Sequence, residues 1–273
     1  MPEGPEIRRV ADRLGRQLVG KPLESVWFAF PELEGEGADL EGRQVMAVES
    51  WGKALLIYFD NDRVMYSHNQ LYGVWKLHRA GRSPSTRRSL RVQLQAGGRT
   101  ASLYSASDVS LWQSDQVQQH PFLSRLGPDL LSHGVSVNDI EERLATAKFR
   151  RRALGGLLLD QGFYAGIGNY LRSEMLFFAG VAPQRRPMDL DDSQRSKLAT
   201  VILDVIQQAY HQAGVTNRPA WIEREKRAGA TRGRWRFAVF GRDGLACHAC
   251  SNQVSRRMVT SRRLYYCPNC QSS

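Results

Sequence analysis

Residues 247–270 read CHACSNQVSRRMVTSRRLYYCPNC, with the cysteines at Cys247, Cys250, Cys267 and Cys270. These are the only four cysteines in the 273 residues. Each Cys-x2-Cys pair puts two thiolates on one short turn, and two such turns close a tetrahedral site around zinc. Because four protein ligands leave no open position, the sequence predicts one structural Zn²⁺ on a β-hairpin zinc finger. A pair of disulfides is the alternative, and the absence of a secretory signal disfavours it.

The charge of the chain is concentrated around this segment. The chain has 38 Lys and Arg against 27 Asp and Glu, a net charge of +11. Residues 211–273 carry 12 basic and 3 acidic side chains, whereas residues 1–210 carry 26 and 24. Such an excess favours a polyanionic partner such as nucleic acid. Aromatic residues interleave with the charges, which argues against a merely solubilising tail. They are Trp221, Trp235, Phe237, Phe240, Tyr265 and Tyr266.

The N-terminal half predicts a helix followed by antiparallel strands. Pro5 suits the first turn of a helix, apolar residues recur at helical spacing from Ile7 to Leu18, and Gly20 can end it. The acidic, Gly-rich stretch 31–42 reads as a solvated loop. Short β-branched and aromatic segments predict a sandwich or barrel. They are residues 23–30, 44–50, 53–59, 63–68, 72–77, 89–95 and 100–105.

Pro and Gly near residues 120–137 mark a domain boundary. Helical patterns follow at 138–147, 151–162, 169–180 and 189–212, and Asn169 occupies a position typical of an N-cap. Residues 213–236 have weak periodicity and read as a linker or mobile loop. The sequence therefore predicts a multidomain α+β protein. Its expected parts are a helix plus β-sandwich (1–125), a helical domain with the linker (126–236) and the zinc finger (237–271).

Neither a membrane helix nor a secretory signal is expected. The chain has no run of 18 apolar residues, and its N-terminal stretch MPEGPEIRRVADRL lacks an apolar core. We expect a cytoplasmic monomer that makes no membrane contact.

Three separated motifs together carry a family resemblance. They are PEGPE at 2–6, GIGNYLR at 166–172 and CPNCQ at 267–271. In this order they resemble the bacterial DNA glycosylase family of formamidopyrimidine-DNA glycosylase and endonuclease VIII. The resemblance implies a helix-two-turn-helix domain at 126–236. Five further segments look like the endonuclease VIII branch. They are VWFAFP (26–31), WGKALL (51–56), YSHNQLYGVW (66–75), LYSASD (103–108) and HPFLSRLGPD (120–129).

The resemblance implies that Pro2, freed by removal of Met1, is the nucleophile. An α-amino group has a pKa near 7.7–8.0, so part of it is neutral at about pH 7, and a helix N-terminus lowers that pKa further. A secondary amine that attacks C1′ of the sugar forms an iminium ion, which acts as an electron sink for elimination of the phosphates. Glu3 would be the general acid, with a raised pKa.

Further site residues follow from the same resemblance. Lys53 would be the second acid–base group, and Arg262 would bind phosphates and assist δ-elimination, although Arg263 beside it is an alternative. Glu6 serves either the chemistry or the helix dipole. Residues Gln70, Leu71 and Tyr72 match a wedge that fills the space left by a flipped base. The alternative for Leu71 and Tyr72 is an apolar core pair in a hairpin. Arg125 and Asn169 match positions that contact the DNA backbone.

The expected function is that of a bifunctional DNA glycosylase and abasic-site lyase. Its expected partner is double-stranded DNA containing oxidised pyrimidines or abasic sites, and its expected substrates are thymine glycol, 5-hydroxycytosine and dihydrouracil. One alternative is an enzyme of the formamidopyrimidine type, acting on oxidised purines. Another is a non-catalytic, zinc-containing DNA-binding protein. Residues 213–236 match no family motif, which leaves base preference open.

Overall fold

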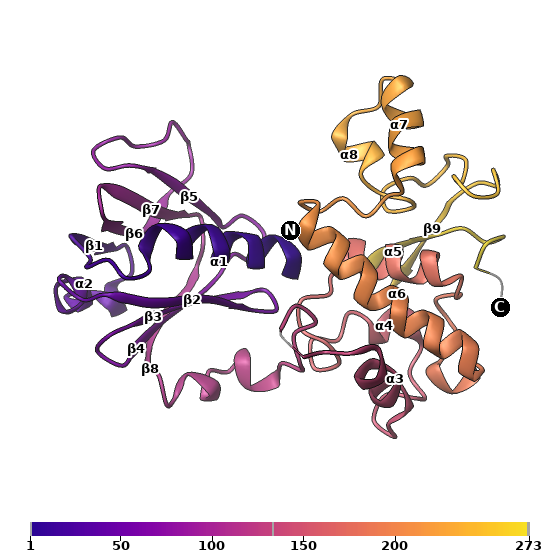
Figure 1. The fold of residues 1–273 in the computed structure, drawn as a ribbon, viewed down its shortest axis with the longest axis horizontal. Coiled ribbons are helices and arrows are strands. Elements are labelled where there is room, and N and C mark those ends of the chain that lie inside the picture. Colours follow the sequence, from indigo (N-terminus) through magenta and orange to yellow (C-terminus); the bar gives the residue numbers. More distant parts are fainter. Residues whose placement is uncertain (1, 133, 272–273) are drawn as a thin grey trace. The chain divides into compact units, whose positions relative to one another are not determined.

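The structure is a computed structural model that describes residues 2–132 and 134–271. Met1, whose removal is predicted to free Pro2, lies outside this range. The chain divides into two compact units, Met1–Arg125 and Leu126–Ser273 (Figure 1). Among the described residues, no helix is long and apolar enough to cross a membrane.

The first unit begins with helix α1 (Gly4–Leu18), as the sequence predicted. Pro5 lies in its first turn, where a missing N–H costs no hydrogen bond. The helix ends at Leu18, and Gly20 then adopts a left-handed conformation with φ of +75°. One face of α1 is buried, and it carries Ile7, Ala11, Leu14 and Leu18.

Two four-stranded antiparallel sheets share one apolar core with α1, which confirms the predicted sandwich. In Figure 1, β5 lies above α1, whereas β2, β3 and β4 lie below it. The first sheet has the order β1-β6-β7-β5, from β1 (Ser25–Phe28), β5 (Val74–Arg79), β6 (Leu90–Ala96) and β7 (Arg99–Tyr104). The second has the order β2-β3-β4-β8, from β2 (Val45–Trp51), β3 (Ala54–Phe59), β4 (Arg63–His68) and β8 (Asp108–Gln113).

Two parts of this unit differ from the expectation. The predicted loop 31–42 contains the short helices η1 (Pro31–Leu33) and α2 (Glu36–Leu40), because Leu33 and Leu40 are buried among its acidic residues. Strand β8 was not predicted. Most of its side chains are only half-buried, so its sequence lacks a clear apolar pattern, and its pairing with β4 defines it. The unit closes with η2 (Val117–Gln119) and η3 (Leu123–Arg125).

The second unit packs its helices around one core. They are α3 (Val137–Ala145), α4 (Leu154–Leu157), α5 (Asn169–Ala179), η4 (Pro187–Asp189) and α6 (Asp192–His211). The predicted helix 151–162 was wrong, since only Leu154–Leu157 is helical. The backbone N–H groups of Leu154 and Gly155 donate to the carbonyls of Arg185 and Pro183 instead of continuing a helix.

The C-terminal hairpin belongs to the same unit. Strands β9 (Ser255–Val259) and β10 (Arg262–Tyr266) are antiparallel, and Leu264 packs into the helical core. The predicted linker 213–236 was also wrong, because it contains α7 (Pro219–Arg227) and α8 (Arg232–Trp235). Neither helix contains a buried residue, which explains why no apolar periodicity revealed them.

Candidate functional site

The start of α1 holds a buried carboxylate next to Pro2. Glu3 is the N-cap residue, and it is only 3% exposed. Its backbone N–H donates to Oε2 of Glu6 at 3.0 Å. Glu6 therefore caps the helix from its first turn, where an acidic side chain also favours the helix dipole.

Lys53 lies in the two-residue turn between β2 and β3, not within the strand. Gly52 precedes it with φ of +59°, the conformation that a type II′ turn requires at its first central residue. Lys53 is only 9% exposed, which is unusual for a lysine. The next residue, Ala54, pairs with His68 of β4. The turn that bears Lys53 therefore lies beside the end of β4, where residues 69–73 begin.

Residues 69–73, called here the wedge turn, carry the chain from β4 in one sheet to β5 in the other. The N–H of Gly73 donates to the carbonyl of Asn69 at 2.7 Å. A Cβ on Gly73 would meet that oxygen at 2.5 Å, so only glycine fits. Leu71 and Tyr72 are 57% and 65% exposed. The alternative of an apolar core pair is therefore wrong, since both side chains are displayed to solvent.

Three residues that the sequence analysis missed hold this turn. His68 accepts the N–H of Gln70 on Nδ1 at 3.0 Å, and Ser107 donates its hydroxyl to Oε1 of Gln70 at 2.7 Å. The guanidinium of Arg88 donates to the carbonyl of Tyr72. Burial lowers the pKa of His68, which keeps the imidazole neutral and Nδ1 able to accept. Gln70 has φ of +48°, so these contacts hold a conformation that is rare for a glutamine.

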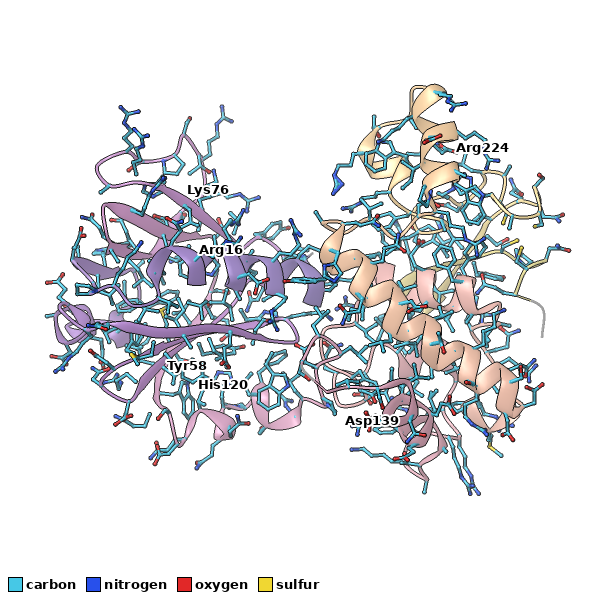
Figure 2. All side chains as sticks on the ribbon, viewed as in Figure 1. Arg16, Tyr58, Lys76, His120, Asp139 and Arg224 are labelled. Atoms are coloured by element: carbon cyan, nitrogen blue, oxygen red, sulfur yellow. The ribbon has the colours of Figure 1, made fainter. Side chains whose placement is uncertain are left out.

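Aromatic stacking fixes the segment that leads to Arg125. The ring of His120, labelled in Figure 2, stacks on Tyr66 with centroids 3.8 Å apart. The hydroxyl of Tyr66 donates to Asp108 at 3.1 Å, and burial raises the pKa of Tyr66 far above its usual value. Arg125 is exposed, and its Nε donates to the carbonyl of Pro121 at 2.7 Å. The Nε atom of its guanidinium is therefore held by the backbone, while the side chain remains exposed to solvent.

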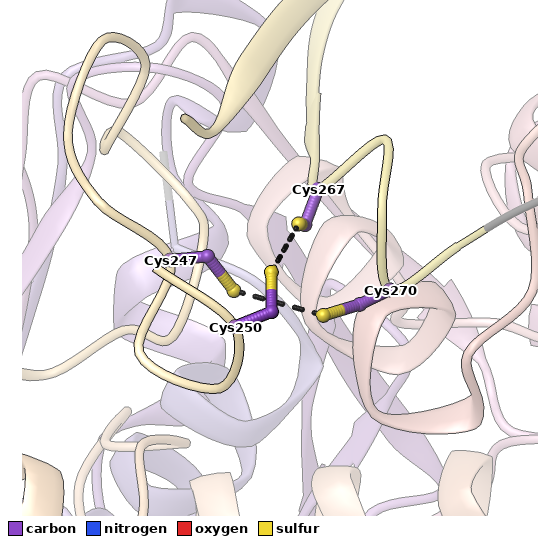
Figure 3. A group of neighbouring side chains, drawn as sticks. All are labelled: Cys247, Cys250, Cys267 and Cys270. Atoms are coloured by element: carbon purple, nitrogen blue, oxygen red, sulfur yellow. Dashed lines mark hydrogen bonds between the residues drawn. The ribbon is translucent and has the colours of Figure 1, made fainter. Parts of the chain in front are cut away.

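The four cysteines of the second unit converge. Figure 3 shows their sulfurs directed toward a common centre, two from the loop before β9 and two from the turn after β10. The Sγ–Sγ distances are 3.8 Å for Cys247–Cys270 and 3.4 Å for Cys250–Cys267, and all four sulfurs lie within 4.8 Å of one another. Zn–S bonds of about 2.3 Å in a tetrahedron place sulfurs about 3.8 Å apart. The set therefore fits zinc.

The pKa values of these thiols are shifted in opposite directions. Hydrogen bonds from Asn252 lower the pKa of Cys250 to about 6. Burial raises the pKa of Cys247 and of Cys270, and the neighbouring sulfurs add to the effect. A bound divalent cation would favour all four thiolates and remove that penalty.

Asn169 contacts the cysteine-bearing hairpin. It is the first residue of α5 and not its N-cap, which is Gly168, so the predicted N-cap was wrong. Its Nδ2 donates to the carbonyl of Arg263 at 2.7 Å, and its Oδ1 accepts from the buried Arg172 at 2.6 Å. The structure therefore brings Asn169 to the strand that bears Arg262.

Arg262 directly follows a tight turn. Thr260 and Ser261 both have positive φ, +49° and +61°, as in a type I′ hairpin turn. Arg262 pairs with Val259 across the hairpin, and its side chain is exposed. Arg263 is exposed as well, so the alternative between the two arginines stays open.

A buried carboxylate orders the chain between α8 and the first cysteine pair. Glu174 of α5 is completely buried and accepts four hydrogen bonds at 2.7–2.9 Å. The donors are the hydroxyl of Thr216 and the backbone N–H groups of Ala238, Val239 and Phe240. Burial raises the pKa of Glu174, and all four donors oppose that shift because they favour the ionised form.

Helix α7 is attached to the first cysteine pair through His248. Trp221 stacks on the His248 ring with centroids 5.1 Å apart, and Arg224, labelled in Figure 2, contacts Nδ1 of His248 at 2.7 Å. Glu225 forms ion pairs with Arg242 and Arg234 at 3.2 and 3.3 Å. The sequence held no signal for these long-range contacts, because they join residues of a segment without apolar periodicity.

The predicted site residues thus fall into two groups. Pro2, Glu3, Lys53, Arg125 and the wedge turn belong to the first unit. Asn169, Arg262 and the cysteines belong to the second. The contacts described above join the Lys53 turn to the end of β4, where the wedge turn begins, and join Asn169 to the hairpin that bears Arg262.

Comparisons with known proteins agree with this architecture. Residues 1–107 match the formamidopyrimidine-DNA glycosylase N-terminal domain, and residues 126–219 match the formamidopyrimidine-DNA glycosylase H2TH domain. The chain is 47% identical over 272 residues to Endonuclease 8 of Pectobacterium atrosepticum, with 100% of both chains covered. It is 45% identical over 271 residues to Endonuclease 8 of Shigella sonnei, covering 99% of this chain and 100% of that one.

Solved structures show the same fold. Lactococcus lactis formamidopyrimidine-DNA glycosylase bound to DNA with an abasic site has a TM-score of 0.80 at 21% identity, covering 99% of this chain and 100% of that one. The same enzyme with N7-benzyl-Fapy-dG DNA has a TM-score of 0.81 at 22% identity, covering 100% of both. The protein therefore belongs to the class of base-excision-repair DNA glycosylases. It belongs to the formamidopyrimidine-DNA glycosylase and endonuclease VIII family.

Proposed function

We propose that this protein removes oxidised pyrimidines from double-stranded DNA and then nicks the strand by β,δ-elimination. The substrates would be thymine glycol, 5-hydroxycytosine and dihydrouracil. The observation that carries the proposal is the start of α1, where Pro2 precedes a carboxylate, Glu3, that is 3% exposed. A nucleophilic amine and a general acid are the two groups that this reaction needs first.

Pro2 would supply the nucleophile once Met1 is removed. Its secondary amine attacks C1′ as the N-glycosidic bond breaks, and the base leaves with the bonding electron pair and takes up a proton. Glu3 protonates the ring oxygen or assists the departing base. The ring opens, and an iminium ion joins C1′ to Pro2. An α-amino group has a pKa of about 7.7–8.0, so part of it is neutral and reactive near pH 7, and the positive end of the α1 dipole would favour that neutral form.

The elimination steps would use Lys53 and Arg262. Loss of a proton from C2′ sends electrons toward the iminium and expels the 3′ phosphate, with Lys53 as the acid–base group. A second elimination expels the 5′ phosphate, which leaves phosphates at both ends of a one-nucleoside gap. Arg262 would bind the phosphates and assist this step. The burial of Lys53 supports its role, because a lysine is almost never buried unless its amine has a specific partner.

The wedge turn would keep the flipped base out of the duplex. The exposure of Leu71 and Tyr72 supports insertion between base steps, and Gln70 could hydrogen-bond the unpaired partner base. Arg125 and Asn169 would contact the DNA backbone.

One Zn²⁺ held by the four cysteines would stabilise the hairpin that bears Arg262. The predicted functional division at 1–125, 126–236 and 237–271 is part of this proposal, as are a monomeric state and action in the bacterial cytoplasm.

Borohydride trapping on a duplex with one thymine glycol tests the proposal, with the N-terminus of the purified protein sequenced in parallel. We expect a covalent protein–DNA adduct and an N-terminal proline. A stronger adduct on 8-oxoguanine than on thymine glycol would replace our substrate assignment with an oxidised purine. If Met1 has been removed and no adduct forms on either lesion or on an abasic site, the alternative of a non-catalytic, zinc-containing DNA-binding protein would be favoured.

A further inference from the structure

The first unit contains a long stretch of sequence without acidic residues. Residues 64–107 contain seven Lys and Arg and no Asp or Glu. Residues 24–41 contain six acidic residues and no Lys or Arg, so the small net charge of this half conceals two segments of opposite charge. The seven cations are Lys76, Arg79, Arg82, Arg87, Arg88, Arg91 and Arg99.

These cations lack carboxylate partners. Among the residues that the structure describes, none of the seven forms a salt bridge with a carboxylate. Five of the seven are exposed: Arg79, Arg82, Arg87, Arg88 and Arg99. Exposed guanidinium groups without carboxylate partners repel one another, so a polyanion would gain from binding there.

Three of the seven cations line one surface pocket, namely Lys76, Arg79 and Arg82. A surface pocket of about 620 Å³ is lined by Arg13 of α1, by Lys76, His78 and Arg79 of β5, and by Arg82 of the following loop. Lys76 is labelled on β5 in Figure 2. The loop 80–89 then returns toward the wedge turn, where Arg88 donates to the carbonyl of Tyr72. We call β5 with its pocket and the loop 80–89 the basic track.

We propose that the basic track binds the phosphate backbone of the duplex that flanks the lesion, an inference that rests on the proposed function. The track starts at the wedge turn and follows β5, whose six residues span about 17 Å. Duplex DNA rises about 3.4 Å per base pair, so the track reaches about five base pairs from the wedge. Its arginines present the forked donors that match phosphate oxygens.

The composition of the loop favours DNA over an acidic protein. Residues 81–89 read GRSPSTRRS, with four hydroxyl side chains beside three arginines and no aromatic or large apolar residue. Hydroxyl groups and arginines are frequent donors to DNA phosphates. The centre of a protein–protein interface instead contains aromatic and apolar side chains, which this loop lacks.

The test measures binding to a duplex that carries one tetrahydrofuran abasic-site analogue, which cannot be cleaved at that site. The variant combines Arg79→Ala, Arg82→Ala and Arg87→Ala, and leaves Arg88 in place because it holds the wedge turn. The control variant removes three cations elsewhere, through Arg43→Ala, Arg195→Ala and Lys197→Ala. A second variant replaces the three track arginines with lysine, which keeps the charge if alanine disturbs the loop.

We expect the alanine variant to reduce the slope of log K against log salt by about 0.9 for each lost contact, or about 2–3 in total. At about 0.1 M salt the affinity should fall at least about 10-fold, and the lysine variant should recover most of it. Truncating the duplex to about three base pairs on one side of the lesion should abolish the difference between wild type and variant. Truncation on the other side should preserve it.

Three results would overturn the inference. The alanine variant could bind DNA as tightly as the control variant. Its loss of affinity could instead be equal on the full-length duplex and on both truncated duplexes. Alternatively, DNA binding could be unchanged while competition by polyglutamate is lost, which would assign the track to an acidic protein. A failure of the proposed function would give another result, which is that the wild-type protein binds damaged and undamaged duplexes with equal affinity.

Discussion

Replacement of Glu174 by glutamine should loosen the segment before the cysteines. One carboxylate oxygen accepts from Val239 and Phe240, and the other accepts from Ala238 and Thr216. A glutamine side chain offers one oxygen and one NH₂ group, so in either orientation two buried donors face another donor. Each hydrogen bond to a charged group contributes about 1.5–3 kcal/mol. The loss should therefore be about 3–6 kcal/mol.

Hydrogen exchange of the backbone amides measures this loss directly, because three of the four donors are backbone N–H groups. A loss of about 3 kcal/mol corresponds to roughly 100-fold faster exchange where opening is local. We expect that acceleration in residues 238–240 of the Glu174→Gln variant. Thr216→Val, which removes only the hydroxyl donor, should give a smaller effect, and Glu141→Gln on the partly exposed face of α3 should give none.

The graded series makes the reasoning refutable. Exchange within about threefold of wild type in Glu174→Gln would mean that the charged acceptor contributes less than about 1 kcal/mol. A Thr216→Val effect as large as that of Glu174→Gln would show that the hydroxyl, rather than the carboxylate, orders this segment.

Four other expectations concern the two units separately. Gly73→Ala should weaken binding to lesion-containing duplex at least about 10-fold, since its Cβ would meet Asn69 at 2.5 Å. Gly15→Ala in α1 is the control, because its Cβ would meet no atom closer than 3.8 Å. An equal loss of binding in both variants would show that distortion of the wedge turn is not the cause. Pro2→Gly should slow nicking at least about 10-fold more than base release, measured by separate product assays, and unchanged nicking would contradict the iminium. Cys250→Ser should lower bound zinc below one per chain by atomic absorption, and a full equivalent would argue against the four-cysteine site. Burial lowers the pKa of His68 from 6.5, so the unfolded chain binds the proton more readily than the folded chain. The stability that this histidine contributes is therefore complete above pH 6.5 and falls as the pH drops through the pKa of the folded state. An NMR titration of the His68 ring with a midpoint at or above 6.5 would refute this expectation.

Local periodicity predicted much of this fold. The repeat from Ile7 to Leu18 gave α1 nearly to the residue, because one face of the helix is buried along its whole length. Seven of the eight strands of the sandwich followed from β-branched and aromatic runs between turn residues. The cysteine spacing predicted the convergence of four sulfurs, since each pair is held by a turn of its own.

The parts that could not be predicted depend on contacts between distant residues. Helix α7 contains no buried residue, and its attachment runs through Trp221, Glu225 and His248. The predicted helix 151–162 failed because Gly155 donates to the carbonyl of Pro183, a partner that only the folded chain supplies. His68 illustrates the same limit at the candidate site, because its role in holding Gln70 depends on its place at the end of β4.

Backbone strain supports the view that the two units present preorganised surfaces. Gln70, Thr260 and Ser261 all have positive φ, a conformation that costs non-glycine residues about 1–3 kcal/mol each. Glycine would remove that cost, yet none of the three positions is glycine. Each strained turn is held from outside, the first by His68 and Ser107 and the second through the hairpin that Asn169 contacts. A turn that is already fixed loses little entropy when DNA binds. The strain therefore lies where the proposed function places its wedge and its phosphate-binding arginine, and the long-range contacts that sequence patterns miss are what keep both in position.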